Sequence, residues 1–165
     1  MQVEAPDLIQ PVAAFRVWRV VDGRLWSPHV DVAWTEPVQR ARCRRPVRDA
    51  PGPSAPLPHA APHPECGCGI YAYHELVPRL RATFQVPGFV LGIVSVWGEI
   101  QAYAEGLRSE YARVRAIAYL GGWGGPANRD RRRAAAGLDA DLVEYPDLEL
   151  AARGYGGPLP AALLP

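Results

Sequence analysis

Bulky apolar and polar residues alternate along the N-terminal part of the chain, as they do in half-buried strands. Over residues 15–27 (FRVWRVVDGRLWS) this alternation continues on both sides of Asp22-Gly23. An Asp-Gly pair between two such runs is typical of a tight hairpin turn. The sequence therefore predicts two short strands joined at this turn, and residues 30–34 (VDVAW) predict a third.

The middle of the chain mixes helical and strand patterns. Residues 70–84 carry apolar side chains at helical spacing. Pro78 lies inside this run, so we expect the helix to be short, kinked or restarted at the proline. Residues 89–97 (FVLGIVSVW) are almost continuously apolar, which is the pattern of a buried strand, and residues 98–106 can form a second strand beside them.

Residues 107–120 (LRSEYARVRAIAYL) fit either kind of element. Leu107, Tyr111, Val114 and Ile117 have helical spacing, whereas the aromatic and β-branched content also suits a strand. We favour the helix, so that a strand is followed by a helix in this region. A short terminal helix is also expected within residues 139–153.

Two segments lack the apolar side chains that would fold them unaided. Residues 37–65 are rich in arginine and proline, and we expect them to form a loop that supplies zinc ligands. Residues 121–137 begin with a glycine-rich stretch and continue into a basic cluster, which predicts a mobile surface insertion. The whole pattern predicts one α+β domain over residues 1–165, with a small, mainly antiparallel sheet, one or two helices and a zinc-clamped loop.

Composition narrows the class of protein. The chain has 165 residues, the usual length of one domain, and its formal net charge of +1 argues neither for a nucleic-acid protein nor for an acidic tail. All 18 basic side chains are arginine, which we interpret as the codon bias of a GC-rich genome. The first residues show no signal-peptide pattern, and no apolar run reaches the roughly 20 residues of a membrane helix. We therefore expect a cytoplasmic protein with no membrane partner.

The strongest chemical pattern is HAAPHPECGCG, residues 59–69, together with one earlier cysteine. Zinc prefers thiolate and imidazole ligands in a tetrahedron, and glycines after the cysteines suit a tight turn around an ion. Cys43, Cys66 and Cys68 are therefore the candidate thiolate ligands of a structural zinc. Either His59 or His63 can complete the set. The alternatives are three free thiols in a flexible loop and a reactive cysteine.

These residues also carry a resemblance to a protein family. The chain resembles uncharacterised bacterial proteins, many of them actinobacterial, in the motif H..P...C.CGIYA followed by G.V..WG.V....G.RAEYA. The resemblance covers about residues 15–120, and Ser109 takes the place of the motif's alanine. It implies that His59, three residues before Pro62, is the fourth ligand. It implies no activity.

Other polar groups suggest two alternative functions. Glu99, Arg108 and Glu110 can line a cleft of a hydrolase or transferase, although a solvated face is the simpler interpretation. Two groups of arginines can contact the phosphates of a nucleic acid, although solvated loops are again the simpler interpretation. These groups are Arg40, Arg42, Arg44, Arg45 and Arg48, and Arg129, Arg131, Arg132 and Arg133. We favour a non-enzymatic, zinc-stabilised binding module with an unknown macromolecular partner.

Overall fold

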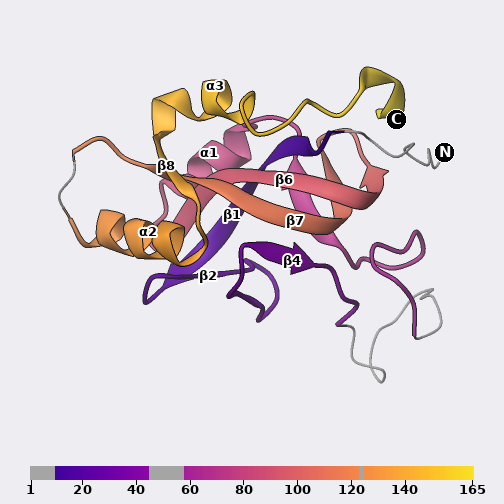
Figure 1. The fold of residues 1–165 in the computed structure, drawn as a ribbon, viewed down its shortest axis with the longest axis horizontal. Coiled ribbons are helices and arrows are strands. Elements are labelled where there is room, and N and C mark those ends of the chain that lie inside the picture. Colours follow the sequence, from indigo (N-terminus) through magenta and orange to yellow (C-terminus); the bar gives the residue numbers. More distant parts are fainter. Residues whose placement is uncertain (1–9, 45–57, 123–124) are drawn as a thin grey trace.

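The fold is an α+β arrangement of one eight-stranded sheet with helices on both of its faces (Figure 1). The structure is a computed structural model that describes residues 10–44, 58–122 and 125–165. The strands are β1 (Val12–Val21), β2 (Arg24–Trp26), β3 (Ala33–Trp34), β4 (Val38–Arg40), β5 (Ile70–Tyr73), β6 (Phe89–Ala102), β7 (Gly106–Tyr119) and β8 (Asp141–Glu144). The helices are α1 (Pro78–Phe84), α2 (Pro126–Gly137) and α3 (Leu148–Ala152), with short 3-10 turns at Tyr145–Asp147 and Ala161–Leu163.

The predicted N-terminal hairpin is present, and its turn has the expected geometry. Asp22 and Gly23 join β1 to β2 with φ angles of 51° and 71°. Two consecutive residues with positive φ match the right-handed twist of the flanking strands, and this is why Asp-Gly is favoured there. β3 follows and pairs with β2, so the third expected strand also forms.

The two longest strands, β6 and β7, form the centre of the sheet and correct the prediction for residues 107–120. This segment is strand β7, which pairs antiparallel with β6 along most of its length. Buried Ala112, Val114 and Ala116 alternate with half-buried Arg113 and Arg115, which is the period of a strand. The helical spacing of the largest apolar residues was therefore misleading, because the small and charged residues between them carried the decisive alternation.

The pairs among β1, β6, β7 and β5 form a closed cycle. β6 lies between β1 and β7, and the short strand β5 pairs with both β1 and β7 on their other sides. All strand pairs in the described residues are antiparallel except β7 with β8. The prediction of an α+β fold with a mainly antiparallel sheet is confirmed.

The predicted helix over residues 70–84 is wrong in its first half. Residues 70–73 form β5, with Ile70 and Ala72 buried and Tyr71 half exposed. The helix starts only at Pro78, which occupies its first turn rather than kinking its interior. Proline suits that position because its missing N–H would have no partner in the helix there.

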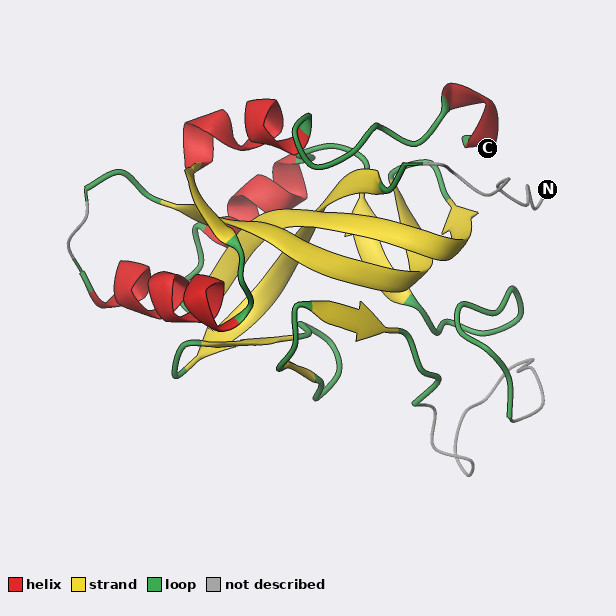
Figure 2. Ribbon diagram, in the orientation of Figure 1, coloured by secondary structure: helices red, strands yellow, loops and turns green. Residues whose placement is uncertain are grey.

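Helices cover both faces of the sheet (Figure 2), and apolar side chains form a core on each face. One core contains Trp18 and Trp34, whose rings meet edge to face at 5.3 Å, and α2 covers it with Ala134. The other core lies under α1 and α3 and includes Phe84 and Leu148. The sheet thus buries both faces, which explains why β6 is apolar almost throughout.

Residues 121–137 are not the mobile surface insertion that the sequence predicts. Most of this segment is helix α2, with Asn128 and Arg131 among its buried residues. Asn128 donates hydrogen bonds of 3.1 Å to the carbonyls of Leu120 and Gly122. Its glycine-rich start hid the helix, and Trp123 lies outside the described residues.

The C-terminal part adds the expected short helix and one unexpected strand. Within residues 139–153, α3 is preceded by β8, which pairs parallel to β7. None of the helices in the described ranges is long and apolar enough to cross a membrane.

Candidate metal centre

Strand β7 brings the predicted ligands together. The last residue of β4, Arg40, pairs with Tyr111 of β7. The first residue of β5, Ile70, pairs with Ser109, two residues closer to the start of β7. The chain therefore leaves the edge of β7 after β4 and returns to nearly the same place. Cys43 lies just after the point of departure, and the HAAPHPECGCG segment lies just before the point of return. Part of the expected loop, residues 38–40, is thus a strand, and residues 45–57 lie outside the described part.

Four side chains converge between the end of β4 and the start of β5. The ligand atoms of Cys43, His59, Cys66 and Cys68 all lie within 4.8 Å of one another and can hold a metal ion. The Sγ atoms of Cys43 and Cys66 are 3.8 Å apart, and Cys68 Sγ is 3.5 Å from His59 Nε2. A disulfide would need a sulfur–sulfur distance of about 2.05 Å, so the three cysteines are free thiols.

The thiols of Cys66 and Cys68 are shifted in pKa in opposite directions. Burial alone would raise the pKa of Cys66, but the Cys68 backbone N–H and the neighbouring Cys43, Cys68 and His59 side chains lower it to about 7. Burial and the adjacent Cys66 sulfur raise the pKa of Cys68 to about 11. The cluster thus holds negative charge on one sulfur and resists a second, which is the situation that a bound cation relieves.

The two candidate histidines have different surroundings. His59 directs Nε2 at the cysteine sulfurs, whereas His63 is not part of the four-residue cluster. His63 instead accepts a 3.2 Å hydrogen bond at Nδ1 from the backbone N–H of Glu65, and its carbonyl accepts from Cys66 N–H. The two rings are 4.7 Å apart, so His63 packs beside the fourth ligand position without occupying it.

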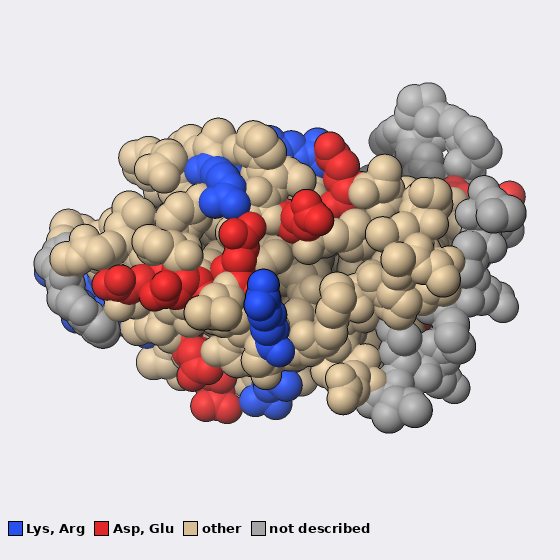
Figure 3. Space-filling model, turned by 90° about the horizontal axis from the view of Figure 1, so that it is seen from above, with Lys and Arg blue, Asp and Glu red and all other residues tan. Residues whose placement is uncertain are grey.

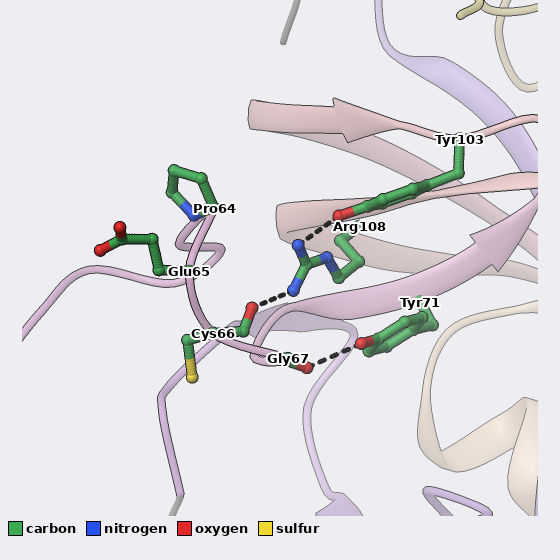
Figure 4. A pocket seen from close by; sticks show the side chains of 7 residues that line it. All are labelled: Pro64, Glu65, Cys66, Gly67, Tyr71, Tyr103 and Arg108. Carbon is green, nitrogen blue, oxygen red and sulfur yellow. Dashed lines mark hydrogen bonds between the residues drawn. The ribbon is translucent and has the colours of Figure 1, made fainter. Parts of the chain in front are cut away.

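Arg108 lies beneath the Cys66–Gly69 turn. Its guanidinium donates to the Cys66 carbonyl and to the Tyr103 hydroxyl (Figure 4). It also donates to the Cys68 carbonyl and to Gln101. Gly69, with φ of 126°, allows this contact, because a Cβ there would lie 3.0 Å from the Cβ of Arg108. The backbone of the turn is therefore fixed by a side chain of the same strand that gathers the ligands.

The three residues expected to line a cleft, Glu99, Arg108 and Glu110, have different surroundings in the structure. Arg108 is buried under the turn, while Glu110 forms an ion pair with Arg40 at 3.1 Å. Glu99 is exposed and approaches Glu110 only through its backbone N–H. Sequence reasoning missed the contacts of Arg108 with the turn, because the pairing of β5 with β7 is what brings these residues together.

A shallow pocket borders the turn and is lined in part by Arg108. It has a volume of about 510 Å³ and is lined by Pro64, Glu65, Cys66, Gly67, Tyr71, Tyr103 and Arg108. Tyr71 and Tyr103 expose about half of their surface, 50% and 44%. Their hydroxyl groups are nonetheless fixed, since Tyr71 donates to the Gly67 carbonyl at 2.7 Å and Tyr103 accepts from Arg108.

The arginine groups do not combine into one basic surface in the described residues. Arg131 is buried and bonds to Asn128, and Arg40 is paired with Glu110. Arg45 and Arg48 lie outside the described part. On the face seen in Figure 3, basic and acidic side chains are interspersed among uncharged ones.

Comparisons with protein-family models, with curated proteins and with solved structures gave no match.

Proposed function

We propose that this protein is a zinc-stabilised binding module in which Cys43, His59, Cys66 and Cys68 hold one structural zinc ion. The distances between the ligand atoms carry the proposal. In a tetrahedron with zinc–sulfur bonds of about 2.3 Å and a zinc–nitrogen bond of about 2.0–2.1 Å, sulfurs lie about 3.8 Å apart and sulfur and nitrogen about 3.5 Å apart. The two distances given above, 3.8 Å and 3.5 Å, are those of such tetrahedron edges.

The type of ligand favours zinc over the other common ions. Three thiolates and one imidazole suit zinc, whereas calcium and magnesium take oxygen ligands. Copper and nickel in the divalent state prefer square-planar arrangements, in which neighbouring ligands would lie closer together than the 3.8 Å and 3.5 Å found here. Four protein ligands also fill the tetrahedron and leave no position for water or substrate, which is the arrangement of a structural rather than a catalytic site.

The metal has a clear structural task. Within residues 58–69, Ala61, Pro62 and Cys66 are the buried residues, so burial stabilises this segment only weakly. Metal binding can supply the missing free energy, because the ligands come together only in the folded state. The ion would join the end of β4 to the start of β5 and so fix the irregular segment against β7.

The surface beside the metal centre is suited to binding. Tyrosine contributes a large contact area at a small cost in conformational entropy, and it is enriched in interfaces. Tyr71 and Tyr103 are exposed, but hydrogen bonds already hold their hydroxyl groups, so these side chains would lose little conformational entropy when a partner binds. We therefore place the macromolecular contact on this pocket. Neither an enzymatic cleft nor a nucleic-acid surface is proposed, because the residues expected for them are dispersed.

Zinc content tests the metal site directly. Purified protein should contain about one zinc per chain, and chelation should lower its melting temperature. Cys66→Ser should lose the metal, and His59→Ala should weaken zinc binding far more than His63→Ala. Equal melting temperatures with and without the metal would remove the structural role, and a larger effect of His63→Ala would overturn the ligand assignment.

The binding surface needs a separate experiment. Partners captured by the wild-type protein should be lost with Tyr71→Ala and retained with Leu150→Ala, which alters a 65% exposed residue on α3. Partners retained by both variants, or lost from both, would place the binding surface elsewhere.

A further inference from the structure

Arg108 is a buried cation without an acidic partner in the described residues. Only 5% of its surface is exposed. Its guanidinium donates only to neutral groups: the carbonyls of Cys66 and Cys68, Gln101 Oε1 at 2.6 Å and the Tyr103 hydroxyl. Its Nε has no hydrogen-bond partner, and none of the ion pairs found in the described ranges includes it. A charge buried in this way is costly unless an opposite charge lies nearby.

The metal centre provides that opposite charge. A zinc dication with three thiolates and a neutral imidazole carries one net negative charge. The Arg108 guanidinium bonds to the carbonyls of two of the three cysteine ligands, so it lies directly beside this centre. We propose that Arg108 is the counter-charge and positioning residue of the metal centre, and this rests on the proposed zinc site. It acts through the peptide groups of Cys66 and Cys68 without coordinating the ion.

The orientation of the turn agrees with this role. In Figure 4 the Cys66 carbonyl points toward Arg108 and its sulfur points away. The bonds from Arg108 therefore fix the peptide planes so that the sulfur faces the cluster. Groups that orient ligands in this way commonly change metal affinity by about 10–100-fold.

Two other partners for the Arg108 charge are less consistent with the contacts. Glu65 borders the same pocket, but its carboxylate points away from the guanidinium in Figure 4. An anionic ligand in the pocket would need accessible free N–H groups, but both terminal nitrogens of Arg108 already donate to two protein acceptors each and its unpaired Nε is buried. The guanidinium thus serves the turn and not the pocket.

The first part of the test compares zinc affinities in competition with a chelator. Arg108→Met removes the charge and should weaken zinc binding about 10–100-fold. Arg108→Lys keeps the charge but not the two-pronged geometry, so it should recover part of the loss. Arg131→Met is the matched control, because Arg131 is also 5% exposed and has no contact with the turn. It should lower stability without changing zinc affinity.

The second part changes the charge of the centre itself. His59→Cys makes the zinc site doubly negative, and Cys43→His makes it neutral. If Arg108 acts as a counter-charge, the loss caused by Arg108→Met should be largest in the His59→Cys background and smallest in the Cys43→His background. A merely structural Arg108 would give the same loss in all three backgrounds, and that result would overturn the proposal. Wild-type protein that binds no zinc would instead overturn the proposed function itself.

Discussion

Replacing Cys43 separates the effect of the metal as a cross-link from its effect on the local turn. Cys43 is the only cluster member that precedes residues 45–57, while the other three lie within residues 59–68. Cys43→Ala leaves three ligands on the second side and releases the first. A cross-linked loop is expected to lose stability when it is opened, because the unfolded chain regains conformational freedom.

The size of this loss follows from the loop length. Cys43 and Cys66 are 23 positions apart, and closing a loop of that length corresponds to about 3.4 kcal/mol at 25 °C. This value is an upper limit, since β4 already tethers the chain and the Ala41 N–H bonds to the Glu110 carbonyl at 2.6 Å. For a chain of this size, the limit corresponds to a fall in melting temperature of at most about 7–14 °C.

The assay compares melting temperatures in excess zinc and after chelation. Cys43→Ala should melt below the wild type in zinc, and the two should melt alike once the metal is removed. Arg42→Ala, an exposed neighbour in the same segment, is the control and should behave as the wild type in both conditions. A fall that persists after chelation would show that Cys43 acts through packing and not through the metal. No fall in zinc would mean that Cys43 is not part of the cross-link.

Three further predictions concern other parts of the structure. Gly69→Ala should weaken zinc binding and cost about 1–3 kcal/mol of stability, because its φ of 126° is strained for alanine. Gly67→Ala should bind zinc normally, because its added Cβ would lie 3.7 Å from the Tyr71 hydroxyl oxygen, which is an ordinary contact. Asn128→Ala removes the bonds to the Leu120 and Gly122 carbonyls and should lower the free energy of unfolding, measured in urea, by about 1–3 kcal/mol. No change would favour the mobile surface insertion that the sequence predicts for residues 121–137. Burial and the Asp141 hydrogen bond raise the pKa of Tyr155 from 10.0 to about 12, so this contribution is complete below pH 10 and lost as the pH rises toward 12. Tyr155→Phe should abolish that part of the alkaline destabilisation, and an unchanged profile would contradict the assignment.

The sequence was most informative where chemistry is local. Asp22-Gly23 marks its turn because both residues must adopt positive φ, and few other pairs do so easily. Cys66 and Cys68, with His59 and His63 as alternatives, were candidate ligands because the residues that bind zinc are few in kind and often lie close together in sequence. In both cases the physical cause lies within about ten residues, so a short stretch of sequence is enough for the prediction.

The sequence was least informative where pairing partners are distant. Residues 70–73 form a strand only because β7 and β1 supply hydrogen bonds from far along the chain. The convergence of Cys43 with the later ligands likewise depends on β4 and β5 sharing one edge of β7. The role of Arg108 was missed for the same reason, since the Cys66 and Cys68 carbonyls that accept its hydrogen bonds lie about 40 positions earlier. Periodicity identifies the face of an element but not the neighbour that the face will meet.

The absence of lysine acquires a structural meaning beside its interpretation as codon bias. Three arginines, Arg16, Arg108 and Arg131, are buried, and each guanidinium lies over an aromatic ring and donates to backbone carbonyls. Burial lowers the pKa of Arg16 to about 10 and also lowers that of Arg131, yet both remain charged near neutral pH. A lysine ammonium loses its proton far more readily when buried and cannot divide its donors between two carbonyls in one plane. These three buried positions therefore depend on the planar guanidinium group of arginine. A variant with lysine at any of them should be less stable, even though the formal charge is the same.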